Sequence, residues 1–298
     1  MPFYKEIDLG KLQQRLREAL HEDIGNGDVT TAAVVPRDRA GESVVIVKED
    51  GVVCGLPILK EIYRLLDESV VVEPEATDGD RVTAGQRVAR IQGPLLSILL
   101  GERVGLNFLG WLSGVATLTR RFVDSVSGRR VEICDTRKTT PLWRDLQKYA
   151  VRMGGGKNHR NGLYDMVLIK ENHIDAAGGI REAVRRVRDR WGDRYAVEVE
   201  TRNLEEVIEA IEANVDRIML DNFPIDKIAS AVQIVGGKCK LEVSGRVTLE
   251  TVERIARTGV DIISVGALTH SSAVLDYTML VQEKRILEEG PAFGEGTS

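Results

Sequence analysis

The second half of the chain repeats one pattern: an apolar run, then polar residues, then an amphipathic stretch. Six such runs predict strands at residues 131–135, 166–170, 196–200, 217–221, 240–243 and 262–265. Between them, apolar positions at helical spacing predict helices at residues 180–191, 204–213, 225–235 and 249–258. The last four strands begin 21, 23 and 22 residues apart, which is about one strand–helix unit for each step.

Strands that alternate with helices at this period are parallel, and near-continuous apolar runs are typical of strands buried on both faces. We therefore expect an α/β barrel, which with six strands would be incomplete. A doubly wound parallel sheet is the alternative, but no Gly-x-Gly-x-x-Gly motif follows any of the runs. In a barrel the active site lies at the carboxyl ends of the strands.

The first half of the chain has a different pattern. Leucines at helical spacing predict a helix over residues 8–22, and short β-type runs follow at 43–48, 52–54, 70–73, 81–82 and 87–91. Residues 95–126 are mostly apolar and predict a long helix. Because Glu102 and Arg103 lie within it, a buried helix fits better than a membrane span. These elements indicate a small sheet domain ahead of the barrel.

Composition narrows the class of protein. With 43% hydrophobic and 29% charged residues, the chain is neither disordered nor membrane-embedded. The net charge of −5 argues against a general nucleic-acid-binding protein, because neutralising phosphates needs a basic face. Three widely spaced cysteines indicate neither a disulfide framework nor a zinc site. The first residues lack the pattern of a secretory signal, so we expect a cytoplasmic protein.

Charge is unevenly distributed. Residues 137–170 hold eight Lys or Arg and two acids, so a basic segment lies within an acidic chain. Arg144, Lys148 and Arg152 recur at intervals of four, which is usual for a solvated helix face, and we expect them to play no part in the site. The polar residues or glycines at all six strand ends are more informative. These ends carry Asp135, Arg137 and Lys138, then Lys170, Glu200, Asp221, Ser244 with Gly245, and Gly266.

A glycine-rich segment, residues 154–160, adds His159 and Arg160 to these cations. Arginine binds carboxylate and phosphate through a planar fork, whereas carboxylates accept hydrogen bonds from sugar hydroxyls or hold Mg²⁺ on a diphosphate. Glycines at the last two strand ends suit a phosphate held by backbone N–H groups. The combination predicts a multiply anionic ligand that carries a sugar.

The turn at residues 78–86 is similar to turns of biotinyl or lipoyl-like carrier domains. Such carriers present a modifiable lysine in a hairpin, and no lysine lies in a matching hairpin here. A carrier or metabolite-binding module would also use only the N-terminal segment and would leave the charged strand ends of the barrel unexplained. This alternative is open at the level of sequence, and a structural sheet is the simpler interpretation.

Ordered motifs along nearly the whole chain resemble the quinolinate phosphoribosyltransferases. They are EDIGNGDVTT (22–31), ER (102–103), LSGVAT (112–117), DTRKTTP (135–141), GGG (154–156), NHR (158–160), GLYD (162–165), LIKENH (168–173), EVE (198–200), MLDN (219–222) and EVSG (242–245). One position departs from the family: Arg246 stands where members often have Gly or Asn, beside the turn expected to bind phosphate.

The resemblance implies an N-terminal α/β sandwich domain, residues 1–112, and an open six-stranded α/β barrel, residues 113–274. A tail of about residues 275–298 can pack on the first domain. The implied reaction joins quinolinate and phosphoribosyl pyrophosphate, and releases CO₂ and pyrophosphate to give nicotinate mononucleotide for NAD biosynthesis. It needs Mg²⁺ and no organic cofactor. A paralogue acting on another pyridine carboxylate is the alternative enzyme.

The resemblance also implies roles for the strand-end residues, in a homodimer with two shared sites. The quinolinate carboxylates are expected to be bound by Arg137, His159, Arg160 and Arg103, the last of which the second subunit contributes. Lys138 and Lys170 are expected to reach phosphate or diphosphate oxygens. Glu200 and Asp221 are expected to hold ribose hydroxyls and Mg²⁺, directly or through water. The expected catalytic residues are Lys138, Lys170, Glu200 and Asp221, and the 5′-phosphate falls to Ser244, Gly245 and Gly266.

Overall fold

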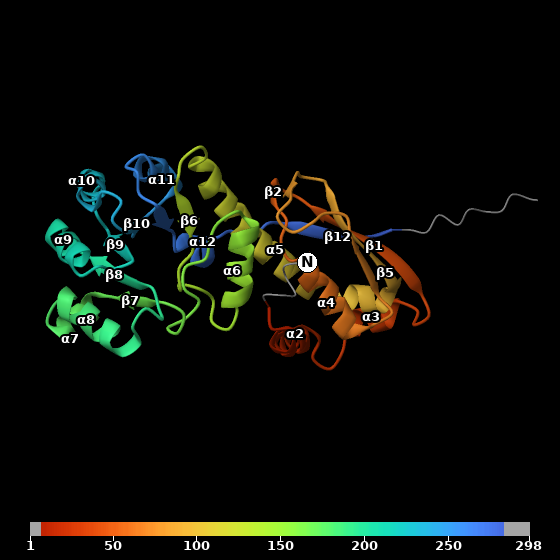
Figure 1. The fold of residues 1–298 in the computed structure, drawn as a ribbon. Coiled ribbons are helices and arrows are strands. Elements are labelled where there is room, and N and C mark those ends of the chain that lie inside the picture. Colours follow the sequence, from red (N-terminus) through yellow and green to blue (C-terminus); the bar gives the residue numbers. More distant parts are fainter. Residues whose placement is uncertain (1–6, 283–298) are drawn as a thin grey trace, which may run out of the picture.

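The long helix α5 (Leu95–Ser125) runs between two sheets in the computed structural model, which describes residues 7–282 (Figure 1). By length and composition alone α5 could cross a membrane, but half of its most apolar window is buried within the protein. It packs against α4 (Leu56–Leu66), α6 (Arg144–Met153) and α11 (Leu249–Ala256). The expected buried helix is therefore confirmed. The domain division expected at residues 112 and 113 falls inside α5 and stays a prediction.

The N-terminal sheet has four antiparallel strands in the order β12-β1-β5-β3. Their bounds are Ala40–Val47 for β1, Val71–Pro74 for β3, Arg87–Pro94 for β5 and Tyr277–Gln282 for β12. A separate pair joins β2 (Gly51–Val52) to β4 (Arg81–Val82). All five β-type runs of the sequence thus form strands. The end of the described chain returns to this sheet, because β12 pairs with β1 over six residues; residues 283–298 lie outside the described residues.

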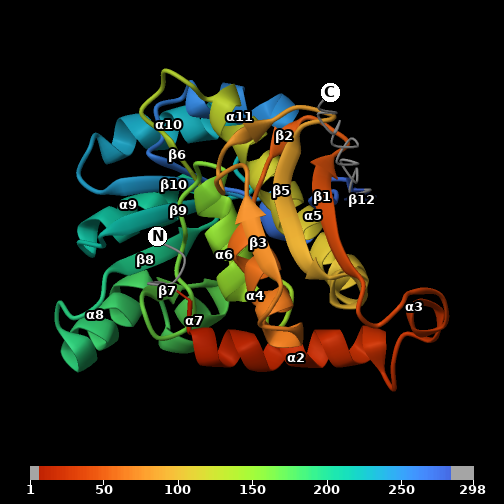
Figure 2. The ribbon, with the colours of Figure 1, turned by 90° about the vertical axis from the view of Figure 1, so that its right-hand side faces the viewer.

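Helix α4 packs against β3 of this sheet, whereas α2 (Leu9–Ile24) runs below the sheet and α3 (Val29–Val34) lies at the lower right in Figure 2. Helix α2 matches the predicted leucine pattern and buries Leu12, Leu16 and Leu20. Sequence patterning missed α3 and α4. The start of α4 is fixed from outside the helix, since the Asp78 carboxylate accepts hydrogen bonds from the N–H groups of Gly55 (2.9 Å) and Leu56 (3.0 Å). Because the capping residue Asp78 lies 22 residues from Leu56 in the chain, the sequence around the start of α4 contains no side-chain capping signal.

The second sheet has six parallel strands in the order β6-β11-β10-β9-β8-β7. They are Glu132–Cys134 (β6), Val167–Ile169 (β7), Val197–Thr201 (β8), Arg217–Asp221 (β9), Lys240–Ser244 (β10) and Ile262–Ser264 (β11). All six predicted strands are present, some of them shorter than expected. The first two strands of this sheet in chain order, β6 and β7, lie at its opposite edges and do not pair with each other. The sheet is therefore open, as expected for an incomplete barrel.

Helices cover the outer side of these strands (Figure 1). Four of them were predicted and occur as α8 (Ile180–Trp191), α9 (Leu204–Glu212), α10 (Ile225–Val235) and α11. Two short helices, α7 (Glu171–Ala177) and α12 (Ala267–His270), were not predicted. Helix α6 begins at Arg144, because Leu142 just before it has a φ of 67°, which is incompatible with helical geometry. Strand β8 is buried on both faces, in accord with its unbroken apolar pattern.

Candidate active site

The ends of β7 and β8 bring Lys170 and Glu200 into contact. Lys170 follows β7 directly and caps α7, and its ammonium forms an ion pair with the Glu200 carboxylate. The Glu200 side chain is 15% exposed and that of Lys170 46% exposed, so both remain open to a ligand. The sheet register that places neighbouring strand ends together accounts for this pair, which is separated by 30 residues in the chain.

Asp221 and Ser244 are register partners at the ends of β9 and β10. Asn222 links the two ends, because its amide donates to the Asp221 carboxylate (2.8 Å) and its N–H donates to the Ser244 carbonyl (2.9 Å). Gly245 has a φ of 98°, and a Cβ there would lie 2.4 Å from Asn222 Oδ1. Glycine is thus required both for the backbone angle and for the close approach. Arg246 has a φ of 49°, a left-handed conformation that Gly or Asn adopts more easily.

Lys138 lies against Gly266, at the point where the segment after β6 meets the end of β11. A Cβ on Gly266 would lie 3.2 Å from Lys138 Cδ. The Thr269 hydroxyl, from α12, donates to the Lys138 carbonyl at 2.7 Å. The structure therefore places the Lys138 stem beside a backbone turn that was expected to bind phosphate.

Arg137 and Arg160 lie near each other, and among the described residues no carboxylate is bonded to either guanidinium. Arg137 Nε is buried and has no hydrogen-bond partner within residues 7–282. Arg160 donates to the Met166 carbonyl at 3.3 Å. Burial, and then the charge of Arg137, lowers the pKa of Arg160. A buried donor without a partner costs free energy, so this arrangement favours the binding of an anion.

His159 is buried in a cluster with Glu198, Arg217 and Glu242. Its Nε2 lies 3.1 Å from Glu198 and 3.5 Å from Glu242, and Arg217 donates to Glu242 at 2.9 Å. Burial lowers the pKa of His159, and it raises the pKa of both Glu198 and Glu242 to about 7. Sequence analysis missed this cluster, although Glu198 shares its strand face with Glu200 at a spacing of two.

The grouping of one histidine with two carboxylates also resembles a metal site. The hydrogen bonds argue otherwise. His159 Nδ1 accepts the backbone N–H of Arg160 at 2.8 Å, so Nε2 carries the proton and has no lone pair for a metal ion. The nearby Arg217 guanidinium also supplies positive charge to the same carboxylates. We assign these residues to a buried hydrogen-bond network.

The prediction of a solvated face on α6 was wrong. Lys148 is buried, and its ammonium donates to the Asp135 carboxylate at 2.6 Å and to the His159 carbonyl at 2.8 Å. Arg144 donates to Thr139 and Asn161, and Arg152 donates to Asn158. The two loops that flank α6 fold back over it, so this charged face of the helix is covered by protein. Spacing along one helix does not reveal such coverage.

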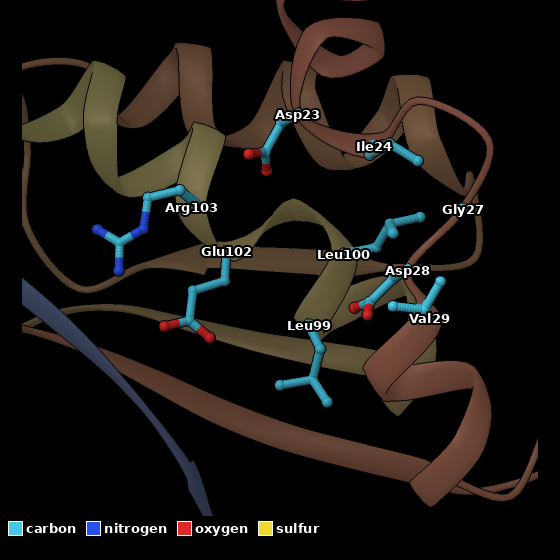
Figure 3. Close-up of a pocket in the computed structure, with 9 residues that line it drawn as sticks. All are labelled: Asp23, Ile24, Gly27, Asp28, Val29, Leu99, Leu100, Glu102 and Arg103. Carbon is cyan, nitrogen blue, oxygen red and sulfur yellow. The ribbon is translucent and has the colours of Figure 1, made fainter.

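Arg103 lies apart from the other candidate residues. It lines a pocket of about 400 Å³ formed by α5 and the segment from α2 to α3 (Figure 3). Figure 3 shows Glu102 and Arg103 extending from the same helix, with Asp23 and Asp28 among the other lining residues. None of the lining residues belongs to the barrel strands. Within one copy of the chain, the structure therefore brings together the barrel candidates but not Arg103.

An open parallel α/β barrel with cations and carboxylates at its strand ends is typical of enzymes that act on small, multiply anionic molecules. Known proteins narrow this class. Residues 28–113 match the N-terminal domain of quinolinate phosphoribosyl transferase, and residues 115–280 match its C-terminal domain. The chain belongs to the quinolinate phosphoribosyltransferase family.

Individual relatives agree. A probable nicotinate-nucleotide pyrophosphorylase [carboxylating] of Bacillus subtilis is 43% identical over 269 residues, covering 90% of this chain and 93% of the relative. A mitochondrial quinolinate phosphoribosyltransferase [decarboxylating] of Nicotiana glauca is 42% identical and covers 97% and 86% of the two chains. The solved nicotinate-nucleotide pyrophosphorylase of Francisella tularensis superposes with a TM-score of 0.90 at 42% identity, covering 93% and 98%.

Proposed function

We propose that the barrel mouth transfers phosphoribosyl from phosphoribosyl pyrophosphate to quinolinate. The products are nicotinate mononucleotide, CO₂ and pyrophosphate, and the pathway is NAD biosynthesis. The main observation behind the proposal is that Arg137 and Arg160 lie near each other, and that the buried Nε of Arg137 has no hydrogen-bond partner among the described residues. Two guanidiniums in one place suit a ligand with two carboxylates. Matches to relatives over both halves of the chain support it and leave a carrier role for the N-terminal part without support.

Quinolinate lies against Arg137, His159 and Arg160 in this proposal. Arg137 and Arg160 present fork-shaped donors to the two ring carboxylates. We include His159 among the quinolinate-binding residues because it is next to Arg160 in the chain. When substrate binds, its ring replaces the hydrogen bond to Glu198 with one to the substrate. The enzyme distinguishes quinolinate from a pyridine with one carboxylate because the second carboxylate of quinolinate is also bound by an arginine. A substrate with one carboxylate would not need so many guanidiniums.

Phosphoribosyl pyrophosphate occupies the remaining strand ends. Lys138 and Lys170 contact phosphate or diphosphate oxygens, and Ser244, Gly245 and Gly266 bind the 5′-phosphate through hydroxyl and backbone N–H groups. Glu200 and Asp221 hold the ribose hydroxyls. Their carboxylates end neighbouring strands, which suits Mg²⁺, an ion that often takes one or two protein carboxylates together with substrate phosphates. When bound, the ion neutralises charge on the diphosphate.

The residues place the reacting groups as follows. The pyridine nitrogen attacks the anomeric carbon while the bond to diphosphate breaks, and Lys138 and Lys170 stabilise the charge of the leaving group. The ring nitrogen is now a cation. The adjacent carboxylate then departs as CO₂ and leaves its electron pair on the ring carbon, where the neighbouring positive nitrogen stabilises it until the carbon takes up a proton. Because the substrate ring supplies this electron sink, no organic cofactor is needed.

The proposal includes a homodimer in which Arg103 of each subunit enters the site of the other. Arg103 is exposed and distant from the barrel candidates within its own chain, which supports this arrangement. We also propose a cytoplasmic location, although plant relatives are named as mitochondrial or chloroplastic proteins.

One experiment tests the function directly. The purified chain is incubated with quinolinate, phosphoribosyl pyrophosphate and Mg²⁺, and nicotinate mononucleotide and CO₂ are measured in equal amounts. A parallel reaction with nicotinate in place of quinolinate tests the paralogue alternative. Product from nicotinate alone would contradict the proposal.

A further inference from the structure

At the proposed quinolinate site, pairing within the sheet does not fix the distance between Arg137 and Arg160. Arg137 follows β6 and Arg160 precedes β7, and these strands are the two unpaired edges of the open sheet. Strand pairing therefore does not set the spacing between the two arginines. A single backbone bridge joins Cys134 to Lys157, but Arg160 lies three residues beyond it.

Electrostatic repulsion opposes a short distance between the Arg137 and Arg160 guanidiniums. Both guanidiniums are positive, and the charge of Arg137 already lowers the pKa of Arg160. Before substrate binds, their repulsion acts to separate the loop that carries Arg137 from the loop that carries Arg160. Other contacts must hold the two loops together in the free protein. Some of these contacts are direct, since the Asp135 carboxylate accepts hydrogen bonds from the His159 N–H (2.9 Å) and the Asn158 amide (2.6 Å).

Helix α6 supplies the others from one face. Arg144, Gln147 and Lys148 stand at spacings of three and four, so their side chains project in a similar direction. Gln147 accepts the N–H of Thr140 at 2.7 Å and donates to the Thr269 carbonyl at 2.6 Å. Lys148 joins Asp135 to the His159 carbonyl.

Arg144 reaches both loops with one side chain. On the first loop it donates from Nε to Thr139 Oγ1 at 2.9 Å and from Nη2 to the Arg137 carbonyl at 3.5 Å. On the second loop it donates from Nη1 to the Asn161 carbonyl at 2.7 Å. Asn161 is the direct neighbour of Arg160. The planar guanidinium fixes the directions of these bonds, so it fixes the distance between the loops as well.

We propose that Arg144 is a positioning residue, which holds the Arg137 loop and the Arg160 loop at the spacing that quinolinate requires. This inference rests on the proposed site. Arg144 contacts backbone and hydroxyl groups of the loops and acts on the substrate through the two arginines. Unlike the fully buried Lys148, it is half-buried, so its removal leaves no charge stranded in the core.

Arg188 provides a matched control. It is a half-buried arginine on α8 that donates to the carbonyls of Gly192 and Tyr195, both at 3.4 Å, and to Asp216 at 2.9 Å. Gly192 and Tyr195 precede β8 and Asp216 precedes β9, so these contacts lie at the end of the barrel opposite the proposed site. Arg188→Ala removes a similar set of bonds without touching either arginine loop.

The experiment compares Arg144→Ala, Arg144→Lys and Arg188→Ala. We expect Arg144→Ala to lower kcat/KM for quinolinate by roughly 10- to 100-fold, since small displacements of binding groups have effects of this order. Arg144→Lys should recover part of the loss, and Arg188→Ala should stay within about twofold of wild type. Wild-type kcat/KM in Arg144→Ala, at a thermal midpoint equal to that of Arg188→Ala, would overturn the proposal.

Two further readouts separate positioning from general stability. In an Arg160→Lys background, Arg144→Ala should change kcat/KM less than about threefold, because both changes act on one binding group; a full additive loss contradicts the proposal. Without substrate, amide exchange at residues 136–140 and 158–162 should accelerate in Arg144→Ala but not in Arg188→Ala. This second readout does not depend on activity, so a wild-type protein that fails to use quinolinate would contradict the proposed function and leave the role of Arg144 separately measurable.

Discussion

At the scale of single residues, the proposed site contains cations that remain available to an anionic substrate. Arg137 keeps a buried Nε without a partner within the described chain, and Lys170 is bonded to Glu200 at the open end of the barrel. We expect Arg137→Ala and Lys170→Ala each to lower kcat/KM by roughly 10²- to 10³-fold, equivalent to about 3 kcal/mol of transition-state stabilisation. Release of CO₂ from quinolinate measures the loss, and circular dichroism checks the fold. Near-normal turnover in both variants would show that the site lies elsewhere.

The buried Glu242 carboxylate gives the protein a pH-dependent stability. Burial raises its pKa from 4.5 to about 7. Below pH 4.5 the side chain is protonated in both folded and unfolded states, and between pH 4.5 and 7 only the unfolded chain releases the proton. The favourable contribution of Glu242 to folding is therefore fully present below pH 4.5 and is lost as the pH rises from about 4.5 to about 7.

The variant Glu242→Gln keeps the shape and cannot ionise. We expect its free energy of unfolding to match that of wild type near pH 4 and to exceed it by about 3 kcal/mol at pH 8. Urea unfolding of both proteins at both pH values measures this difference, which includes the coupled titration of the neighbouring Glu198. An equal difference at pH 4 and pH 8 would mean that Glu242 ionises normally in the folded protein.

At the scale of elements, the terminal strand β12 closes the N-terminal sheet against β1. Met279 is buried beside Val45 and Tyr63, whereas Leu280 on the opposite face of the strand is 48% exposed. We expect Met279→Ala to lower the free energy of unfolding by about 2–4 kcal/mol and Leu280→Ala by less than about 1 kcal/mol. Urea unfolding of the two variants measures both. Equal effects would argue that β12 does not pack on β1 in solution.

At the scale of the whole molecule, the separation of Arg103 from the barrel candidates makes the assembly testable. Arg103→Ala and Lys138→Ala should each be inactive as pure dimers. After subunit exchange, half of the dimers are mixed and each mixed dimer has one intact site, so about a quarter of wild-type activity should return. Activity is followed as nicotinate mononucleotide formed, and native mass spectrometry verifies the mixed dimers. No recovery in verified mixed dimers would contradict a shared site.

The sequence by itself determined most of the elements and the positions of most candidate residues. The six strands of the barrel, four of its helices and the polar strand ends follow from apolar periodicity, which is a local property of the chain. The family motifs that contain Lys170, Glu200, Asp221 and Gly245 can also be found in the sequence alone. These residues could be expected to lie close together because parallel strands bring their carboxyl ends to one edge of the sheet.

Only the tertiary structure decided what covers each face. Lys148 has the spacing of a solvated residue, yet the loops before and after α6 enclose it against Asp135. Glu198 and Glu242 occupy predicted strands, but their contacts with His159, which lies in the segment before β7, join residues that are far apart in the chain. Whether a polar side chain is solvated or buried depends on segments far away in the chain, and the desolvation of charge that follows is set by three-dimensional packing rather than by local pattern.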